Sequence, residues 1–325
     1  MSLAVPARRR AIDKAWALYE SDYMPQASRE SGAVMQIPDD YESWLRQQFP
    51  SYFTATHGEP LSFAPYHHEL WQWVWQMRPG VSPAPFVAIW PRGAGKSTSV
   101  ELACIVMALF RLRRYALYVS ATQEQADDHV GNNIATLCEE AHMDRLVSKY
   151  GHSRGWRRNR VRTLTGFTVD ALGLDVAGRG VKLEDARPDV LILDDLDQEN
   201  DTEHTILKKI RSLTRKLLPA GSQDLAVIGI QNLIHDQGIF ARLVDGRADF
   251  LSTRVISGPY PALEGLAYEG SGKTATLTHG KALWSGLSLE ICQQKVNLMG
   301  LEAFLAECQH EQHALQGTMF GDVWM

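Results

Sequence analysis

The sequence predicts an α/β fold with a central, mostly parallel sheet and flanking helices. Apolar segments of strand length alternate with segments of helical length between residues 86 and 257. The strand segments are apolar at almost every position, which is typical of parallel strands that are covered on both faces. Hydrophobic residues make up 45% and charged residues 22% of the 325 residues. This composition supports a globular chain with a sizeable core.

Each element of the core is predicted from one segment. Helices are expected over residues 98–113, which are apolar on nearly all faces, and over residues 123–150. Alternation around Thr165 and Gly166 predicts a hairpin over residues 161–172, inserted into the core. Strands are expected at Phe86–Trp90, Ala116–Ser120, Val190–Leu193, Leu225–Ile230 and Phe250–Ile256.

The chain is expected to have three parts. Residues 1–60 combine aromatic residues with proline breaks and predict an N-terminal helical arm. Residues 61–257 form the α/β core. Residues 258–325 predict a small lid or linker subdomain, in which a Gly-, Pro- and Thr-rich stretch precedes two helices within residues 287–310. The sequence GSGKT at 270–274 follows no apolar strand, so we interpret it as a flexible loop.

Composition argues against several classes of protein. No apolar stretch is long enough to cross a bilayer, and the N-terminal residues lack the apolar core of a secretory signal. Cys104, Cys138, Cys292 and Cys308 include no close pair, which argues against a zinc site or a disulfide framework. The net charge of −5 means that nucleic acid would have to bind to local basic patches. A cytosolic site of action is expected.

The most informative segment is the glycine-rich turn that follows the first predicted strand. Gly93 and Gly95 allow the backbone N–H groups around Ala94 to point at phosphate oxygens, and the start of the next helix adds partial positive charge. Lys96 would reach the β- and γ-phosphates, Ser97 would bind Mg²⁺, and Thr98 follows in the first helical turn. The segment therefore predicts a phosphate-binding loop (P-loop, or Walker A motif), although Trp90 stands where the strict pattern has glycine.

Two acidic residues end the strand at 190–193 and predict a second half of the same site. Asp194 would hold Mg²⁺ through water, and Asp195 would polarise the attacking water, as in a Walker B motif. Asp197 and Glu199 are the fallback candidates for the base. The stretch from Lys96 to Asp194 has room for at least one additional strand and helix, as in RecA-like ATPases.

Further polar residues are candidates for contacts with the terminal phosphate. Gln231 and Asn232 follow another strand, and one of them could sense the γ-phosphate, although turns favour Asn in any case. Arg179, in a Gly-Arg-Gly segment, and Arg92, inside the P-loop, are alternative arginine fingers. Each arginine could equally form an ordinary surface ion pair.

Two basic clusters could follow a nucleic-acid backbone, although charge runs are often only solvated faces. The first interleaves arginines with Trp156, and the second is a run of lysines and arginines within residues 208–216. Their members are Arg154, Arg157, Arg158, Arg160 and Arg162, and Lys208, Lys209, Arg211, Arg215 and Lys216.

Several separated stretches together resemble the ATPase part of bacteriophage large terminases. They are PYHHELWQWV, the Arg-x-x-Gly-Lys-Ser form of the P-loop, YVSATQEQADDHV, RPDVLILDD after a Gly-Arg-Gly segment, and LWSGLSLE, FLAECQHE and GTMFGDVW near the end. The resemblance covers residues 65–324. Asp195 stands where that family usually has Glu, and Glu69 stands near the position of an adenine-contacting Gln.

This resemblance implies a RecA-like (ASCE) P-loop NTPase that uses ATP and Mg²⁺. It further implies a ring of subunits that moves double-stranded viral DNA into a procapsid in the host cytoplasm, with a portal protein and a small terminase subunit as partners and no membrane. The nuclease domain usual in the family would lie beyond Met325, so no nuclease activity is expected from this chain. The alternatives are a helicase-like remodelling ATPase and an ATP-binding assembly module with little turnover.

Overall fold

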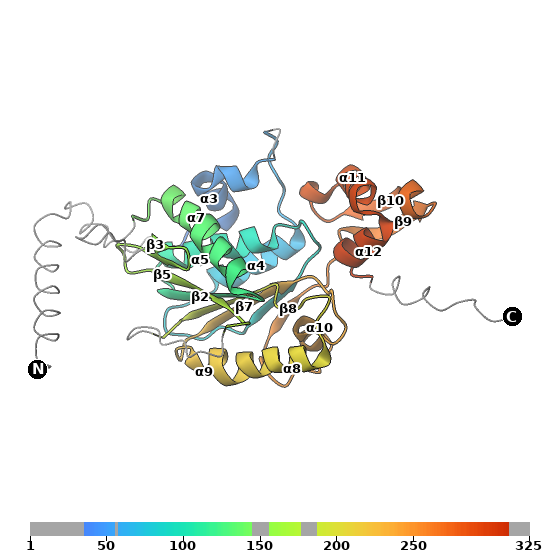
Figure 1. The fold of residues 1–325 in the computed structure, drawn as a ribbon. Helices are drawn as coiled ribbons and strands as arrows, with labels where there is room; N and C mark the ends of the chain where they lie inside the picture. The colour runs from blue at the N-terminus through green and yellow to red at the C-terminus, as the bar shows by residue number, and fades with distance from the viewer. Residues whose placement is uncertain (1–35, 56–57, 145–155, 177–186, 312–325) are drawn as a thin grey trace, which may run out of the picture.

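The computed structural model describes residues 36–55, 58–144, 156–176 and 187–311. Within these ranges, eight strands form one sheet in the order β3-β4-β5-β2-β6-β7-β1-β8, and helices cover both of its faces (Figure 1). All neighbours from β5 to β8 pair in parallel, and only β3 and β4 at one edge are antiparallel. The predicted mostly parallel α/β sheet is therefore confirmed.

The strands and helices have the following bounds. The strands are β1 Phe86–Ile89, β2 Tyr115–Ser120, β3 Trp156–Arg157, β4 Arg160–Arg162, β5 Thr168–Gly173, β6 Val190–Asp194, β7 Ala226–Gln231, β8 Val255–Ser257, β9 Leu263–Glu269 and β10 Thr276–Ala282. The α-helices are α3 Tyr41–Gln48, α4 Pro65–Trp75, α5 Lys96–Leu109, α6 Gln123–Asp128, α7 Ala135–Glu140, α8 Glu203–Ser212, α9 Leu218–Ala220, α10 Ile239–Val244, α11 Leu289–Met299 and α12 Leu301–Gln309. Short 3₁₀ turns span Pro50–Phe53, Gly272–Thr274 and Ser285–Leu287, and π-helical segments span His129–Ile134 and Leu213–Leu217.

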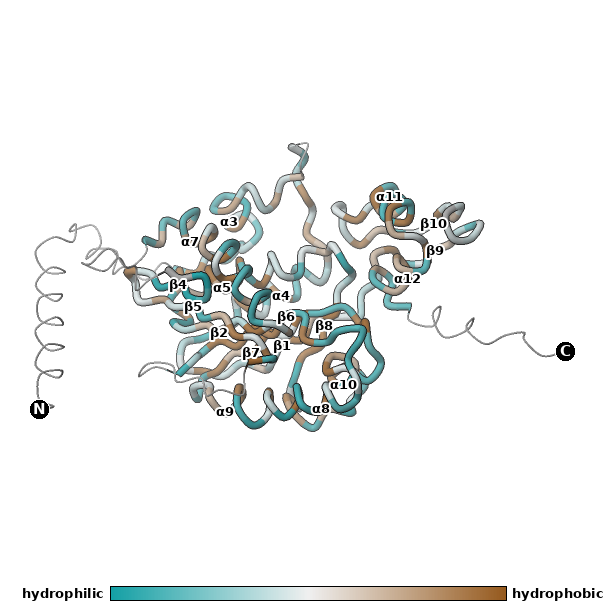
Figure 2. Tube along the Cα trace, viewed as in Figure 1, coloured by the Kyte–Doolittle hydropathy of each residue, from teal (hydrophilic) through white to brown (hydrophobic). Residues whose placement is uncertain are grey.

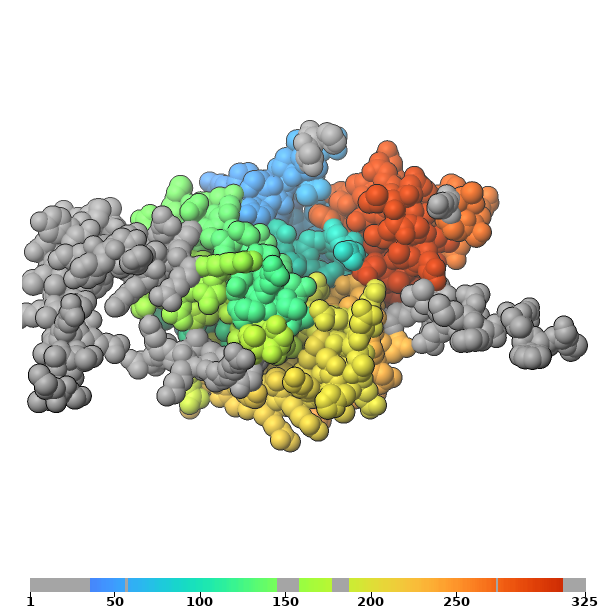
Figure 3. Space-filling view, viewed as in Figure 1, coloured from blue at the N-terminus to red at the C-terminus, as the bar shows by residue number. Residues whose placement is uncertain are grey.

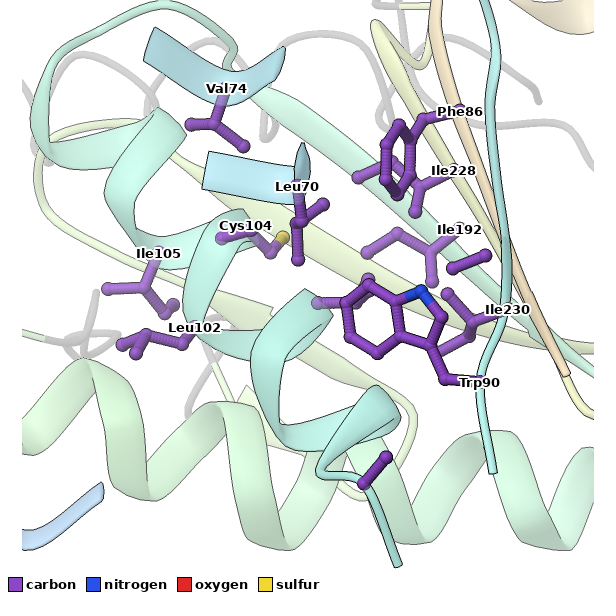
Figure 4. Close-up of a cluster of buried hydrophobic side chains, with 14 of the residues drawn as sticks. Leu70, Val74, Phe86, Trp90, Leu102, Cys104, Ile105, Ile192, Ile228 and Ile230 are labelled. Carbon is purple, nitrogen blue, oxygen red and sulfur yellow. The ribbon is translucent and has the colours of Figure 1, made fainter. Parts of the chain in front are cut away.

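The alternation of side chains along each strand builds two apolar layers, one on each face of the sheet. One face of the sheet is covered by α4 and α5 (Figure 4). On this face the strand residues Phe86, Ile192 and Ile228 pack in one cluster with Trp90 and with Leu70 of α4. The alternate residues of the same strands face α8, α10 and the segment between α8 and α9. Figure 2 shows the central strands as the most hydrophobic part of the core. Burial on both faces explains why the strand segments are apolar throughout.

The strand order places both predicted phosphate-site motifs at one edge of the sheet. The P-loop follows β1, Asp194 ends β6, and β7 lies between these two strands. Parallel strands end at the same edge, so the P-loop and Asp194 face each other across the end of β7. The inserted strand and the order β8-β1-β7-β6-β2 are those of a RecA-like fold, as expected.

Several predicted core elements end at other residues in the structure, and the helix expected over residues 98–113 ends at Leu109, two residues before Arg111 with its φ of 53°. The helix expected over residues 123–150 includes a π-helical segment and ends at Glu140, because His142 adopts a positive φ of 54°. The strand expected from Phe250 is shortened to β8, because Leu251 adopts a φ of 49° and its carbonyl accepts the N–H of Arg254. The predicted hairpin at 161–172 is confirmed as β4 and β5.

The Gly-, Pro- and Thr-rich stretch from residue 258, for which no strand was predicted, leads into the antiparallel hairpin β9–β10. The GSGKT sequence, which we interpreted as a loop, connects its two strands and includes a 3₁₀ turn. Most residues of β9 and β10 are exposed, so the sequence shows little apolar alternation. Leu263 and Leu277 anchor the hairpin beside α11 and α12, which confirm the two predicted helices. Figure 3 shows this C-terminal subdomain, in orange and red, beside the core.

The described part of the predicted arm packs on the core. Leu45 of α3 and the following Phe49 are buried, and Trp44 lies against Phe110 with ring centroids 4.9 Å apart. None of the helices in the described ranges has the length and apolar character to span a membrane.

Candidate nucleotide-binding and catalytic site

The P-loop has the conformation that its glycines predict. Gly93 and Gly95 adopt φ values of 86° and 74°, which L-residues other than glycine rarely tolerate, and α5 begins at Lys96. Trp90 is fully buried, its ring lies 4.8 Å from that of Tyr66, and its Nε1–H donates to Ser257 Oγ at 2.8 Å. Trp90 therefore anchors the loop to the core at the position where the strict pattern has glycine.

Lys96 is folded back over its own loop. Its Nζ donates to the carbonyl oxygens of Trp90 and Pro91, each at 3.1 Å. Burial lowers the pKa of Lys96, while the nearby charges of Asp195 and Asp194 act in the opposite direction. The ammonium thus stands between the loop backbone and the two carboxylates, where phosphate oxygens can replace the carbonyl partners.

Asp194 and Ser97, the candidate Mg²⁺ ligands, lie close to each other. Asp194 is only 1% exposed, and its Oδ2 accepts a hydrogen bond from the hydroxyl of Tyr118. Burial raises the pKa of Asp194 overall, while the nearby Ser97 hydroxyl acts to lower it. Asp194 Oδ1 is buried and has no hydrogen-bond partner among the described residues. A buried carboxylate oxygen with free lone pairs beside a hydroxyl fits Mg²⁺, which prefers oxygen ligands and retains several waters.

The sequence interpretation missed a partly buried histidine beside this carboxylate. His129 Nδ1 lies 2.6 Å from Glu101 Oε1, and His129 Nε2 lies 3.6 Å from Asp194 Oδ2. Burial alone would lower the pKa of His129, but the hydrogen bond to Glu101 and the charge of Asp194 raise it overall. One signal was present in the sequence, because Glu101 is a charged residue in a helix that is otherwise apolar after its first turn.

Asp195 faces the same space as the P-loop cations. Its φ of 48° turns the chain sharply after β6, and its backbone N–H donates to the carbonyl of Ile230 at 3.3 Å. Burial and the charge of Asp194 raise the pKa of Asp195 to about 6, although Lys96 and Arg92 act to lower it. A carboxylate with such a pKa is ionised at neutral pH and is basic enough to accept a proton.

The two fallback candidates for the base, Asp197 and Glu199, have different surroundings from Asp195. Asp197 accepts the backbone N–H groups of Ile239 and Phe240 at 2.8 and 2.9 Å, so it fixes the start of α10. Glu199 is exposed. Asp195 is also exposed, but it lies close enough to Lys96 and Arg92 for their charges to lower its pKa, so it remains the candidate base.

The side chain of Gln231 is hydrogen-bonded to the turn after β6. Its Oε1 accepts the N–H of Asp197 at 3.0 Å, and its Nε2 donates to the carbonyl of the same residue at 2.8 Å. This side chain braces the loop that carries Asp195. The neighbouring Asn232 points elsewhere and donates to Glu307 Oε2 at 2.7 Å, which makes it the better placed of the two to respond to a ligand.

Glu307 of α12 also holds Arg92. The two side chains form an ion pair at 3.3 Å, and the Arg92 N–H donates to the Glu307 carbonyl at 2.9 Å. The C-terminal subdomain therefore contacts both the P-loop and the end of β7. Arg179, the alternative arginine finger, lies outside the described residues.

A second residue absent from the sequence interpretation supports the P-loop from α4. The backbone N–H of Ala64 donates to His67 Nδ1 at 3.1 Å, which fixes the tautomer, and His67 Nε2–H donates to the carbonyl of Ala94 at 2.9 Å. His67 is 7% exposed, and burial lowers its pKa to about 4. The neutral ring thus tethers the loop to the helix before β1.

This tether predicts a pH-dependent contribution to stability. An unfolded histidine titrates near 6.5 and folded His67 near 4, so the contribution is complete above pH 6.5 and is lost as pH falls toward 4. The advantage of the wild type over His67→Gln in the free energy of unfolding should shrink by up to about 3 kcal/mol over this range. Urea denaturation of both proteins at several pH values measures this difference in the free energy of unfolding. His279→Gln, at an exposed site on β10, is the control, and a pH-independent difference for His67→Gln would contradict the assignment.

A cavity of about 190 Å³ opens on the flank of α5 opposite Asp194. Gly95, Thr98 and Ser99 form its floor, and aromatic side chains from three other segments form its walls. These walls are Tyr52, Phe53, Phe63, His67, Trp71 and Trp284. Glu69 does not line this cavity but accepts a hydrogen bond from the hydroxyl of Tyr260.

Much of the predicted basic surface is already engaged. Arg158 lies 3.2 Å from Asp128, and Arg160 pairs with Asp170. Arg154 and the side chain of Arg157 lie outside what the structure describes, and buried Lys209 pairs with Asp201. The exposed remainder includes an α8 basic stripe, which we define as Lys208, Arg211 and Arg215 and which follows helical spacing.

The fold resembles those of several solved phage DNA-packaging proteins. The HK97 bacteriophage large terminase is 12% identical with a TM-score of 0.45, over 69% of this chain and 45% of that chain. The N-terminal domain of the DNA packaging ATPase from bacteriophage phi29 is 15% identical with a TM-score of 0.42, over 59% and 94%. A Thermus phage large terminase ATPase domain is 15% identical with a TM-score of 0.31, over 46% and 60%. The chain thus spans less than half of the HK97 protein. No protein-family model and no curated protein sequence matches it.

Proposed function

We propose that this chain is a Mg²⁺-dependent ATP hydrolase that drives double-stranded viral DNA into a procapsid. The observation that carries the ATPase assignment is the convergence of Lys96, Ser97 and the Asp194–Asp195 pair at one edge of the sheet. The ordered set of terminase-like motifs between residues 65 and 324 supports the packaging role.

The site suggests how ATP would lie. The triphosphate would rest on the N–H groups of the P-loop and the start of α5, with Lys96 between its terminal phosphates. The adjacent cavity has a suitable size and aromatic lining for the nucleobase, and Phe63 and Trp284 are its candidate stacking partners. The two flanks of α5 would then separate base recognition from catalysis.

Hydrolysis would be divided among the residues of the opposite flank. Ser97 and Asp194 would hold Mg²⁺, which neutralises charge on the phosphates. Asp195 would orient the attacking water and accept its proton. Arg92 or Arg179 would stabilise charge that develops on the transferred phosphoryl group, in the same subunit or in a neighbour. Arg92 would first have to leave its ion pair with Glu307.

The proposed partners are DNA, further copies of this chain in a ring, a portal protein and a small terminase subunit, in the host cytoplasm. The α8 basic stripe is the candidate DNA contact within the described residues, because its side chains are exposed and share a sign of charge. The alternative of an ATP-binding assembly module is favoured by one observation, the shorter Asp195 at the position where the resembling family has Glu.

Steady-state ATP turnover with and without double-stranded DNA tests this function. Turnover by the wild type should rise several-fold when DNA is added, and it should rise with protein concentration if subunits complete one another's sites. Changing Lys208, Arg211 and Arg215 together to Ala should leave turnover without DNA intact. In a separate binding titration, the plot of log DNA-binding constant against log salt concentration should become less steep by about 2 to 3. A chain that hydrolyses ATP but neither binds DNA nor responds to it would contradict the packaging role and retain the ATPase assignment.

A further inference from the structure

A lysine from the C-terminal subdomain lies directly over the P-loop. A Cβ built on Gly93 would stand 2.9 Å from Lys295 Nζ and 3.5 Å from Lys295 Cε. Lys295 belongs to α11, far from the P-loop in sequence, and Leu287, just before that helix, lies 3.7 Å from the same point. Gly93, which has no side chain, thus permits the positive φ of the turn and also leaves space for the Lys295 ammonium.

The ammonium of Lys295 makes no hydrogen bond or ion pair with any residue in the described ranges. Two other basic residues are paired: Lys281 of the same subdomain reaches Glu264 at 3.5 Å, and Arg92 of the P-loop reaches Glu307. Lys295 is nevertheless only partly exposed. A partly desolvated cation without a counter-ion is unfavourable unless an anion joins it.

The charges around this point would suit an anion of high charge. Burial raises the pKa of the Cys308 thiol, and the positive charges of Lys295, Lys96 and Arg92 all act in the opposite direction. One buried sulfur thus lies close to three cations from two segments, α11 and the P-loop, and close to the Glu307 carboxylate of α12. Only Arg92 among the three has an ion-pair partner within 4 Å in the described chain, and that partner is Glu307.

We propose that Lys295 is a phosphate-binding residue, which the C-terminal subdomain supplies to the terminal phosphates of a nucleoside triphosphate on the P-loop. This inference rests on the proposed function, because it takes the P-loop as the nucleotide site. It assigns to the phosphate site a lysine that lies outside the P-loop and Walker B motifs.

The contacts that hold the subdomain fix the position of Lys295. Trp284 Nε1–H donates to the carbonyl of Ser62 at 2.8 Å on one side of the P-loop. On the other side, Arg92 N–H donates to Glu307, and the N–H of Leu233 donates to His310 Nδ1 at 3.3 Å. Loss of the terminal phosphate would remove one attraction between α11 and the core, while these anchors remain.

Equilibrium binding to the full chain tests the proposal, with a non-hydrolysable ATP analogue and ADP as probes in the presence of Mg²⁺. Lys295→Met should weaken binding of the ATP analogue by about 10- to 100-fold, because a charge-assisted contact is lost, and should weaken ADP binding less. Lys295→Arg, which keeps the cation, should recover most of the affinity. Lys281→Met removes a lysine from the same subdomain away from the P-loop and should bind both nucleotides like the wild type.

The outcomes separate this proposal from the function on which it rests. If the wild type binds neither nucleotide, the proposed function fails. If the wild type and Lys281→Met bind both nucleotides and Lys295→Met matches them within twofold, the role of Lys295 is overturned. An equal loss for the two nucleotides, or no recovery in Lys295→Arg, would also overturn it. The melting temperature without nucleotide checks folding, and Lys295→Gln replaces Lys295→Met if the latter does not fold.

Discussion

Lys96→Ala should weaken binding of Mg·ATP by about 100-fold or more, because it removes a charged donor from the centre of the phosphate site. Among the described residues, the Lys96 ammonium bonds only to the carbonyls of Trp90 and Pro91 in its own loop, so its removal breaks no side-chain contact with another element. The fold should therefore survive the substitution. Titration of a fluorescent ATP analogue measures the affinity, and the melting temperature confirms folding.

Lys208→Ala is the matched control for Lys96→Ala. Lys208 is exposed on α8, on the opposite face of the sheet from α5. The Lys208→Ala variant should therefore bind the analogue like the wild type. Affinity that is unchanged in Lys96→Ala would remove the P-loop assignment. Affinity that falls equally in both variants would indicate non-specific binding to basic residues.

Asp195→Asn should lower the turnover number by about 10²- to 10⁴-fold, the usual contribution of a positioned base, while Mg·ATP affinity stays within a few-fold of the wild type. The substitution keeps the shape of the side chain and removes its ability to accept a proton. Single-turnover release of phosphate measures the chemical step. Glu199→Gln changes the exposed fallback candidate nearby and should leave turnover unchanged.

The pH dependence of kcat/KM gives an independent test of Asp195. A base works only when ionised, and the pKa of Asp195 is raised to about 6 by burial and by Asp194. Activity should therefore fall as pH drops through about 6, and not only near the ordinary carboxyl value. A profile that stays flat down to pH 5, or full turnover in Asp195→Asn, would assign the proton transfer to another group.

The sequence was sufficient for the elements whose signal is local. Buried parallel strands such as β1 and β6 are apolar at every position because both faces are covered, and Gly93 and Gly95 mark a turn that other residues rarely adopt. The spacing of the two motifs left room for an additional strand and helix, which favoured a RecA-like fold. The pairing of Asp194 with Ser97 could be anticipated for the same reason, because parallel strands end at one edge.

The remaining parts of the site depend on contacts between distant segments, which no local pattern encodes. His67 reaches Ala94 from α4, His129 reaches Asp194 from a π-helical segment, and Lys295 reaches Gly93 from α11. The hairpin β9–β10 was missed for a different reason. Its strands are mostly exposed, so they carry little of the apolar alternation on which strand prediction depends.

Release of inorganic phosphate from ATP by the wild-type chain, measured with and without Mg²⁺ and with Asp195→Asn as the blank, tests the central claim most directly. Release should depend on Mg²⁺, should continue beyond one phosphate per chain, and should be nearly abolished in Asp195→Asn. Tight ATP binding without multiple turnover, at any protein concentration and with or without double-stranded DNA, would contradict the central claim and favour an ATP-binding assembly module.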